Sequence, residues 1–168
     1  EYVSVHIADR ARTRARVLNV GGHTFIKNIE VSIMIGGTHM RKVAMATKRI
    51  LIVDDDADIR EATQLCLEIT GQWEVLMAGN GPDGLAIAQL EKPTAILLDM
   101  MLPGMDGITI LKKLRENPDT QEIPIIILTA KAQSSEKKVF DQLKVAAVIT
   151  KPYDPMTISD EIASALVI

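Results

Sequence analysis

The sequence from Lys48 to the C-terminus predicts an α/β fold, in which a five-stranded parallel sheet carries helices on both faces. Short aliphatic runs alternate with longer helical patterns five times along this part of the chain. The runs are almost continuously apolar, which is typical of strands buried on both faces. Strands that run in the same direction need helical crossovers between them, so the regular alternation favours one parallel sheet.

The first strand and helix follow directly from the residue pattern. Residues 49–53 form a β-branched, aliphatic run, and helical spacing follows over residues 57–70, with Gly71 at the expected helix end. Asp56 and Asp58 are expected to cap this helix and to lie in its first turn. The apolar positions of the helix are Ile59, Ala62, Leu65, Cys66 and Ile69. This stripe is predicted to pack on the sheet, with Cys66 in the core.

The remaining elements continue the alternation. Residues 73–78 form the second predicted strand, and Asn80 is placed to cap a helix that has Pro82 in its first turn and ends before Pro93. The later elements are predicted as strand 94–98, a helix that begins behind Asp106 and carries Ile108, Leu111 and Leu114, strand 123–128, helix 134–143, strand 145–149 and helix 155–166.

Polar residues end four of the five predicted strands, and they are Asp54, Asp55, Asp99, Thr129 and Lys151. In an open α/β sheet the carboxyl ends of the strands meet at one crevice. Three carboxylates there would repel one another unless a cation compensated them. A cluster of oxygen ligands without His or Cys favours Mg²⁺. With an ammonium and a hydroxyl opposite, such a site can hold a transferring phosphoryl group.

These motifs together resemble the receiver domain of two-component response regulators. They are Ile50-Leu-Ile-Val-Asp-Asp-Asp56, Asp99-Met-Met-Leu-Pro-Gly-Met-Asp-Gly107, Thr129-Ala130 and Lys151-Pro152-Tyr153. The resemblance covers residues 48–168, with every motif in order. It implies a flavodoxin-like (CheY-like) fold with strand order 2-1-3-4-5. It also implies a cis peptide bond before Pro152.

The resemblance implies a role for each site residue. Asp99 would accept a phosphoryl group from a phosphohistidine, and Thr129 and Lys151 would bind that group. The implied Mg²⁺ ligands are Asp54, Asp55, Asp99 and the backbone carbonyl of Met101. The family usually has an aromatic residue three positions before the lysine, where this chain has Val148, so the aromatic part of the switch is missing. Met101 and Lys131 would flank the path of attacking water and hinder hydrolysis.

Residues 1–47 differ from the rest of the chain in charge. Seven basic and three acidic side chains give them a net charge of +4, whereas twelve and nineteen give residues 48–168 a net charge of −7. Alternating apolar residues and two glycine pairs predict a small antiparallel β-meander. Its cationic positions repeat at Arg10, Arg12, Arg14 and Arg16. We expect a solvated edge here that discourages aggregation, rather than a nucleic-acid-binding surface.

The origin of this β-rich extension has two interpretations. Gly37-Thr-His-Met40 is typical of a cloning junction, and Met40 or Met45 would be a natural start ahead of a receiver. We therefore expect residues 1–39 to be partly or wholly a leader added by cloning. The alternative is a genuine β-rich module that docks on receivers or is swapped between them.

The predicted function is that of a signalling phosphoacceptor rather than an enzyme. A lone cysteine, the lack of a signal sequence and the lack of a membrane-spanning run favour the cytoplasm. Because no DNA-binding region follows the last helix, we expect a stand-alone receiver that acts through protein contacts. Its partners would be a sensor histidine kinase or phosphotransfer protein and an unknown protein target, with no nucleic acid, and a homodimer is one candidate assembly.

Three other classes of protein are alternatives to a receiver. A pseudo-receiver would keep the fold as a scaffold without phosphotransfer, and the intact acidic and basic residues argue against it. A flavin-binding protein would need a phosphate loop where Asp54, Asp55 and Asp56 would repel a phosphate. A phosphatase with an aspartyl nucleophile fits the spacing of Asp54 and Asp56 but leaves Asp99 unexplained.

Overall fold

The structure of the chain is a computed structural model. The structure describes residues 2–6, 11–20, 23–35, 38–44, 48–71, 73–130 and 134–166, and side chains within 48–71, 73–130 and 137–166. The chain divides into two compact units, Glu1–Thr47 and Lys48–Ile168. No helix in these described ranges has the length and apolar character needed to cross a membrane.

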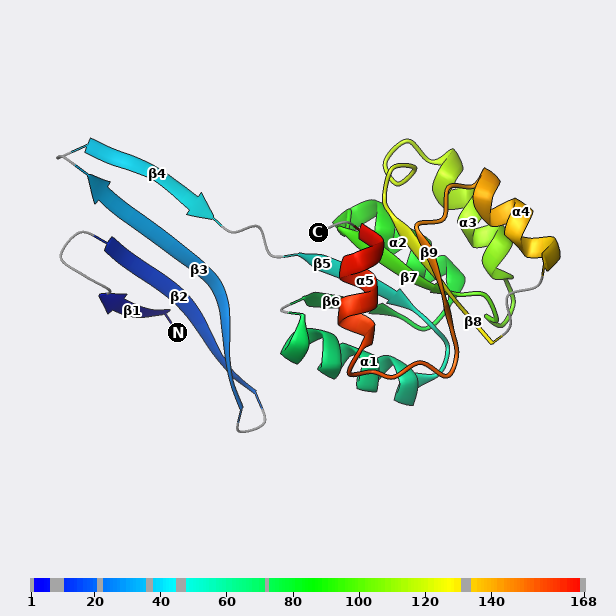
Figure 1. Cartoon of the computed structure of the whole chain (residues 1–168), viewed down its shortest axis with the longest axis horizontal. Coiled ribbons are helices and arrows are strands. Elements are labelled where there is room, and N and C mark those ends of the chain that lie inside the picture. Colours follow the sequence, from blue (N-terminus) through cyan, green and yellow to red (C-terminus); the bar gives the residue numbers. More distant parts are fainter. Residues whose placement is uncertain are drawn as a thin grey trace. The chain divides into compact units, whose positions relative to one another are not determined.

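The second unit is built on a five-stranded parallel sheet with the order β6-β5-β7-β8-β9 (Figure 1). Its strands are β5 (Arg49–Val53), β6 (Glu74–Ala78), β7 (Ala95–Asp99), β8 (Ile125–Thr129) and β9 (Ala147–Thr150). Counted within this unit, the order is 2-1-3-4-5, which confirms the predicted flavodoxin-like topology. Every residue of β7 and β8 is buried, as expected for strands covered on both faces.

Five helices cover this sheet: α1 (Ala57–Thr70), α2 (Gly81–Glu91), α3 (Gly107–Glu116), α4 (Ser134–Gln142) and α5 (Ile158–Leu166). Leu67 of α1 and Ile158 and Ile162 of α5 pack in one core cluster. Residues of α2, α3 and α4, including Ala88 and Phe140, pack in the other. Helices α1 and α5 therefore lie on one face, with α2, α3 and α4 on the opposite face (Figure 1).

Three helices begin at the capping residues that the sequence predicts, Asp56, Asn80 and Asp106. The side chain of Asp56 accepts a hydrogen bond from the Ile59 amide at 3.1 Å, and Asn80 caps α2 in the same way. Asp106 accepts from both the amide and the hydroxyl of Thr109, at 2.9 and 2.8 Å. The hydrogen bond from the Thr109 amide is the main cause that lowers the pKa of Asp106. These bonds satisfy amides that the first helical turn leaves without partners.

The predicted buried face of α1 was wrong. Leu65 and Ile69 are 53% and 62% exposed, and Cys66 is only partly buried. The inward residues are Leu67 and Thr63, both at most 1% exposed. Thr63 can lie inside because its hydroxyl forms a 2.8 Å hydrogen bond with the Tyr153 hydroxyl. The hydrogen bond to Tyr153 therefore allows Thr63 to be buried, while the apolar residues Leu65 and Ile69 are exposed.

The last predicted elements were displaced by a few residues. Strands β8 and β9 each begin two residues later than expected, and α5 begins at Ile158 because residues 155–157 form a turn. In that turn the Thr157 amide donates to the Asp154 carbonyl at 3.1 Å. These shifts leave the order of the elements unchanged.

The first unit is a four-stranded antiparallel sheet in the order β1-β2-β3-β4, as the meander prediction required. Its strands are β1 (Tyr2–His6), β2 (Ala11–Val20), β3 (His23–Ile35) and β4 (Thr38–Ala44). Alternate positions of β2 are occupied by Arg12, Arg14 and Arg16. In the backbone register of the two strands, Arg14 lies opposite Glu30 of β3. Arg10 and the two glycine pairs lie outside the described residues.

Candidate functional site

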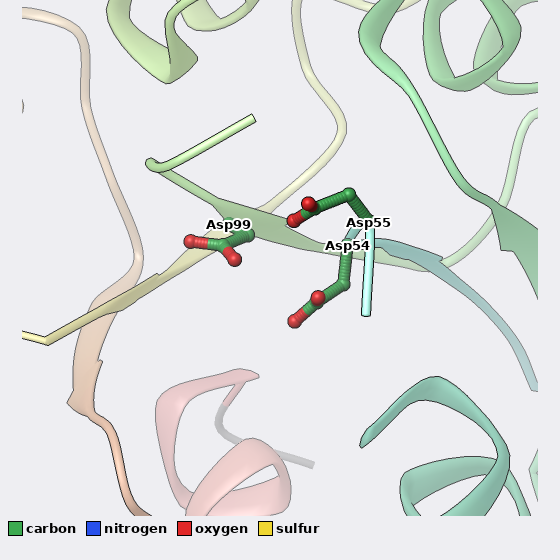
Figure 2. Close-up of side chains that lie close together, drawn as sticks. All are labelled: Asp54, Asp55 and Asp99. Carbon is green, nitrogen blue, oxygen red and sulfur yellow. The ribbon is translucent and has the colours of Figure 1, made fainter. Parts of the chain in front are cut away.

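Three acidic side chains meet at the carboxyl ends of β5 and β7 (Figure 2). One oxygen from each of Asp54, Asp55 and Asp99 lies within 4.8 Å of the others. Asp54 and Asp99 are 0% and 4% exposed, whereas Asp55 is open to solvent. The pairing of β5 with β7 is what brings these acids together from distant parts of the sequence.

Each buried acid is oriented by a backbone amide two residues further along the chain. Asp54 Oδ1 accepts a hydrogen bond from the Asp56 amide at 2.9 Å, and Asp99 Oδ1 accepts one from the Met101 amide at 2.9 Å. The Asp54 amide in turn donates to the Ala78 carbonyl at 3.1 Å. In both acids, a hydrogen bond from the following turn therefore holds Oδ1, and this fixes the direction in which Oδ2 points.

Lys151 binds the second oxygen of both buried acids. Its Nζ lies 2.6 Å from Asp54 Oδ2 and 2.6 Å from Asp99 Oδ2. Burial is the largest single effect and would lower the pKa of Lys151, but the hydrogen bonds to Asp54 and Asp99 and the negative charges of these two acids together leave this pKa above its usual value. The ammonium is thus held charged between the two carboxylates.

Lys151 is placed by the end of β9 and the turn after it. The Lys151 amide donates to the Thr129 carbonyl at 2.8 Å, which ties β9 to the end of β8. The Lys151–Pro152 peptide bond is cis, as the resemblance implied. Thr129 is 5% exposed and ends the strand that separates the strands of Asp99 and Lys151.

The other predicted positions lie outside the carboxylate cluster. Val148 lies on β9 and is 39% exposed, and Met101 is 74% exposed. Met101 contacts the site through its amide, which bonds to Asp99. Lys131 lies outside the described residues.

Sequence reasoning missed a cation beside the acidic cluster. Arg60, in the first turn of α1, donates from its NH1 to the backbone carbonyl of Asp54 at 2.6 Å. A signal was present, because a helix that begins directly after three acids brings its first turn close to them. The pattern could not show that the guanidinium would bond to a carbonyl rather than to a carboxylate.

The donor set fits a hard divalent cation. All three cluster members offer carboxylate oxygens, and the described residues contribute no His or Cys to the group. Three carboxylates and one ammonium leave a formal charge of −2, which one divalent ion would balance. Because Asp55 is exposed, the site is open to water, which Mg²⁺ retains in most protein sites.

A comparison with protein families favours the receiver over the flavin-binding protein and the phosphatase. Residues 50–163 match the response regulator receiver domain. The chain belongs to this family. Receiver domains are signalling phosphoacceptors rather than enzymes with a separate substrate. They interact with histidine kinases or phosphotransfer proteins. They bind Mg²⁺ at an acidic pocket.

Two similar proteins of Pseudomonas aeruginosa show how far this receiver extends. The phosphate regulon transcriptional regulatory protein PhoB is 45% identical over 113 residues, which cover 66% of this chain and 48% of PhoB. Protein PilH is 37% identical over 118 residues, which cover 70% of this chain and 97% of PilH. The chain therefore spans about half of PhoB and nearly all of PilH.

Solved receiver structures have the same fold. The Vibrio cholerae chemotaxis protein CheY4 superposes with a TM-score of 0.67 at 28% identity, covering 71% of this chain and 99% of CheY4. A CheY-like receiver domain protein of Methanospirillum hungatei superposes with a TM-score of 0.65 at 32% identity, covering 73% of this chain and 95% of that protein. The part of this chain covered in each case fits the size of the second unit.

Proposed function

We propose that this receiver accepts a phosphoryl group on Asp99 from a phosphohistidine of a sensor histidine kinase or phosphotransfer protein, in a Mg²⁺-dependent reaction. The observation that carries this proposal is the geometry around Asp99. Its carboxylate is nearly buried, one oxygen is held by the Met101 amide, and the other lies 2.6 Å from Lys151 Nζ. A buried, oriented carboxylate beside a fixed cation is suited to attack a negatively charged phosphoryl group.

In the proposed reaction, a carboxylate oxygen of Asp99 forms a bond to phosphorus in line with the histidine nitrogen. The phosphohistidine ring carries a proton on its other nitrogen, so that the P–N bond breaks with its electron pair on a neutral imidazole, and Asp99 becomes an acyl phosphate. Lys151 moves its hydrogen bond from the acceptor carboxylate to a phosphoryl oxygen, and the Thr129 hydroxyl donates to another. Mg²⁺, held by Asp54, Asp55, Asp99 and the Met101 carbonyl, would supply positive charge to the transferred oxygens.

The proposed output begins at Thr129. Its hydroxyl would be drawn toward the phosphoryl oxygens, which would repack the surface formed by β8, α4 and β9 as a two-state switch that partner proteins recognise. Val148 stands at the position of the usual aromatic residue. It has no aromatic ring that could alternate between two orientations. The change on β9 is therefore expected to be smaller than in receivers with an aromatic residue there.

The match to nearly the whole of PilH supports a single-receiver organisation. Such a receiver would signal through protein contacts, in our proposal in the cytoplasm. The match to half of PhoB favours the alternative of a receiver within a longer regulator. A pseudo-receiver that binds partners without phosphotransfer is the remaining candidate. A homodimer is compatible with each of these organisations.

The decisive experiment is labelling with acetyl phosphate, a small acyl phosphate donor, followed by intact mass measurement. The wild-type chain should gain one phosphoryl group with Mg²⁺ and none with excess EDTA, and Asp99→Asn should gain none. Asp58→Asn is the matched control, because Asp58 lies in the first turn of α1 outside the carboxylate cluster. Equal labelling of wild type and Asp99→Asn, or no labelling of either, would refute the proposed chemistry.

A further inference from the structure

Arg60 lies beside the loop that carries two of the three clustered carboxylates. Its NH1 is 2.6 Å from the carbonyl oxygen of Asp54. Its guanidinium also lies close to Gly79, directly after β6, because a Cβ added to Gly79 would be 3.5 to 3.6 Å from the guanidinium atoms. In the ranges whose side chains are described, the ion pairs do not include Arg60. A cation next to an acidic cluster thus bonds to the main chain and leaves the carboxylates available.

The bonds around Arg60 form a closed network in the turn between β5 and α1. The Asp56 amide bonds to the Asp54 carboxylate at 2.9 Å, and the Asp56 carboxylate caps α1 through the Ile59 amide at 3.1 Å. The Arg60 amide donates to the Asp56 carbonyl at 3.0 Å. The guanidinium closes the network at the Asp54 carbonyl, so that the first turn of α1 holds both ends of the Asp54–Asp56 turn.

We propose that Arg60 is a positioning residue for the divalent cation, and that it acts by fixing the backbone from which Asp54 and Asp55 project toward Asp99. The inference rests on the proposed function, because it concerns the same cation site. Arg60 does not contact the ion in this proposal. It restricts the turn, so that the exposed Asp55 carboxylate is held near the two buried ones before the ion arrives.

The charge of Arg60 and its positioning role have opposite effects on cation binding. A positive side chain close to the carboxylates repels a divalent cation, so its removal should strengthen binding if charge alone matters. Removal of the bond to the Asp54 carbonyl frees the turn, so binding should weaken if positioning matters. The sign of the change in Mg²⁺ affinity therefore distinguishes the two roles.

The experiment is calorimetric titration of the full chain with MgCl₂, comparing wild type with Arg60→Met and Arg60→Lys. We expect Arg60→Met to raise the Mg²⁺ dissociation constant about fivefold to tenfold, comparable with the net loss of one typical hydrogen bond. Arg60→Lys keeps the charge and one donor but loses the planar group close to Gly79, so we expect a rise of about twofold to threefold. Lys112→Met, at an exposed position of α3, is the control for the charge change and should not weaken binding.

A second readout separates positioning from general damage to the fold. In acetyl phosphate labelling, the Mg²⁺ concentration needed for half the maximal rate should rise in Arg60→Met, while the rate at saturating Mg²⁺ returns to the wild-type value. Should Arg60→Met not fold, judged by urea unfolding, Arg60→Lys still decides, because its charge is unchanged and any weakening reports lost positioning.

The outcomes are distinct. Unchanged or tighter Mg²⁺ binding in Arg60→Met, or an unchanged dissociation constant in a folded Arg60→Lys when Arg60→Met does not fold, would overturn the positioning role and leave the proposed phosphotransfer intact. Failure of the wild-type chain to bind Mg²⁺ would overturn the cation site of the proposed function and, with it, this inference.

Discussion

Lys151 is the residue on which the stability of the acidic site depends. Its ammonium binds Asp54, which is fully buried, and Asp99, which is nearly so. Removal of one partner from a buried ion pair leaves an uncompensated charge and costs about 3 to 5 kcal/mol. We therefore expect Lys151→Met to lower the free energy of unfolding in EDTA by about 3 kcal/mol, as measured by urea denaturation. Added Mg²⁺ should stabilise the variant more than the wild type, because it would replace the missing positive charge.

The stability difference between wild type and Lys151→Met should depend on pH with a definite sign. The pKa of Lys151 is raised in the folded chain, so its stabilising effect is complete below the unfolded value of about 10.4 and is lost as the pH rises through the folded pKa. The stability difference between wild type and Lys151→Met should stay constant from about pH 6 to 9 and shrink above about pH 10.4. A difference that grows at alkaline pH would contradict this account of Lys151, and Lys112→Met should show no such dependence.

At this scale the sequence identified the residues of the site because polar side chains at strand ends are informative. Asp54, Asp99 and Lys151 could be placed together from topology alone, since the carboxyl ends of parallel strands share one edge. The contact of Arg60 with a carbonyl and the hydrogen bond between Thr63 and Tyr153 could not be predicted. Both depend on how far α1 is rotated about its axis, which no local pattern specifies.

Among the elements, α3 is connected to two other segments through one side chain. Arg115 Nε donates to the Leu143 carbonyl at 2.7 Å, and NH2 donates to the Lys144 carbonyl at 3.1 Å, directly after α4. NH1 donates to the carbonyls of Gln121 and Ile123, before β8, at 2.8 and 2.9 Å. Burial lowers the pKa of Arg115. One guanidinium therefore provides donors for four carbonyls at the ends of neighbouring segments.

We expect Arg115→Met to lower the free energy of unfolding by about 2 kcal/mol, because several carbonyls lose a charged donor and only some of them regain water. Arg115→Lys should recover less than half of the loss, since one ammonium cannot reach four carbonyls. Urea denaturation gives the stability change. Faster hydrogen exchange at the amides of Val145 and Ala146 would place the loss at this junction. Equal stability of Arg115→Met and wild type would show that water replaces the guanidinium without loss.

The error in α1 shows what element-level patterns leave out. Its sequence contains two overlapping sets of residues at helical spacing, one with Leu65 and Ile69 and one with Thr63 and Leu67. Hydrophobicity favours the first set, but the sheet selected the second, because Leu67 fits the core beside Ile158 and Thr63 has a partner in Tyr153. The existence and bounds of a helix follow from local signals, whereas its buried face depends on neighbouring elements.

For the whole molecule, the strand order was predictable and the role of the N-terminal sheet was not. Among the residues whose side chains the structure describes, both core clusters are built from the second unit, which also holds all the residues assigned to phosphotransfer. Alternating apolar residues predicted the antiparallel meander of residues 2–44, which the structure contains. Periodicity identifies a sheet but says nothing about the surface that covers it, and so the alternatives of a cloning leader and a genuine module need a measurement.

We expect deletion of residues 1–39 to change the free energy of unfolding of the receiver by less than about 0.5 kcal/mol, and to leave acetyl phosphate labelling of Asp99 unchanged, because the five strands of its sheet and the residues assigned to phosphotransfer all belong to the second compact unit. Urea denaturation followed by Trp73 fluorescence measures the first quantity, since Trp73 is 4% exposed within the receiver core. Deletion through Val53 is the control and should abolish folding, because it removes β5, an interior strand that pairs with both β6 and β7. A loss of more than about 1 kcal/mol, or a change of oligomeric state on deletion of 1–39, would instead favour a β-rich module that functions with the receiver.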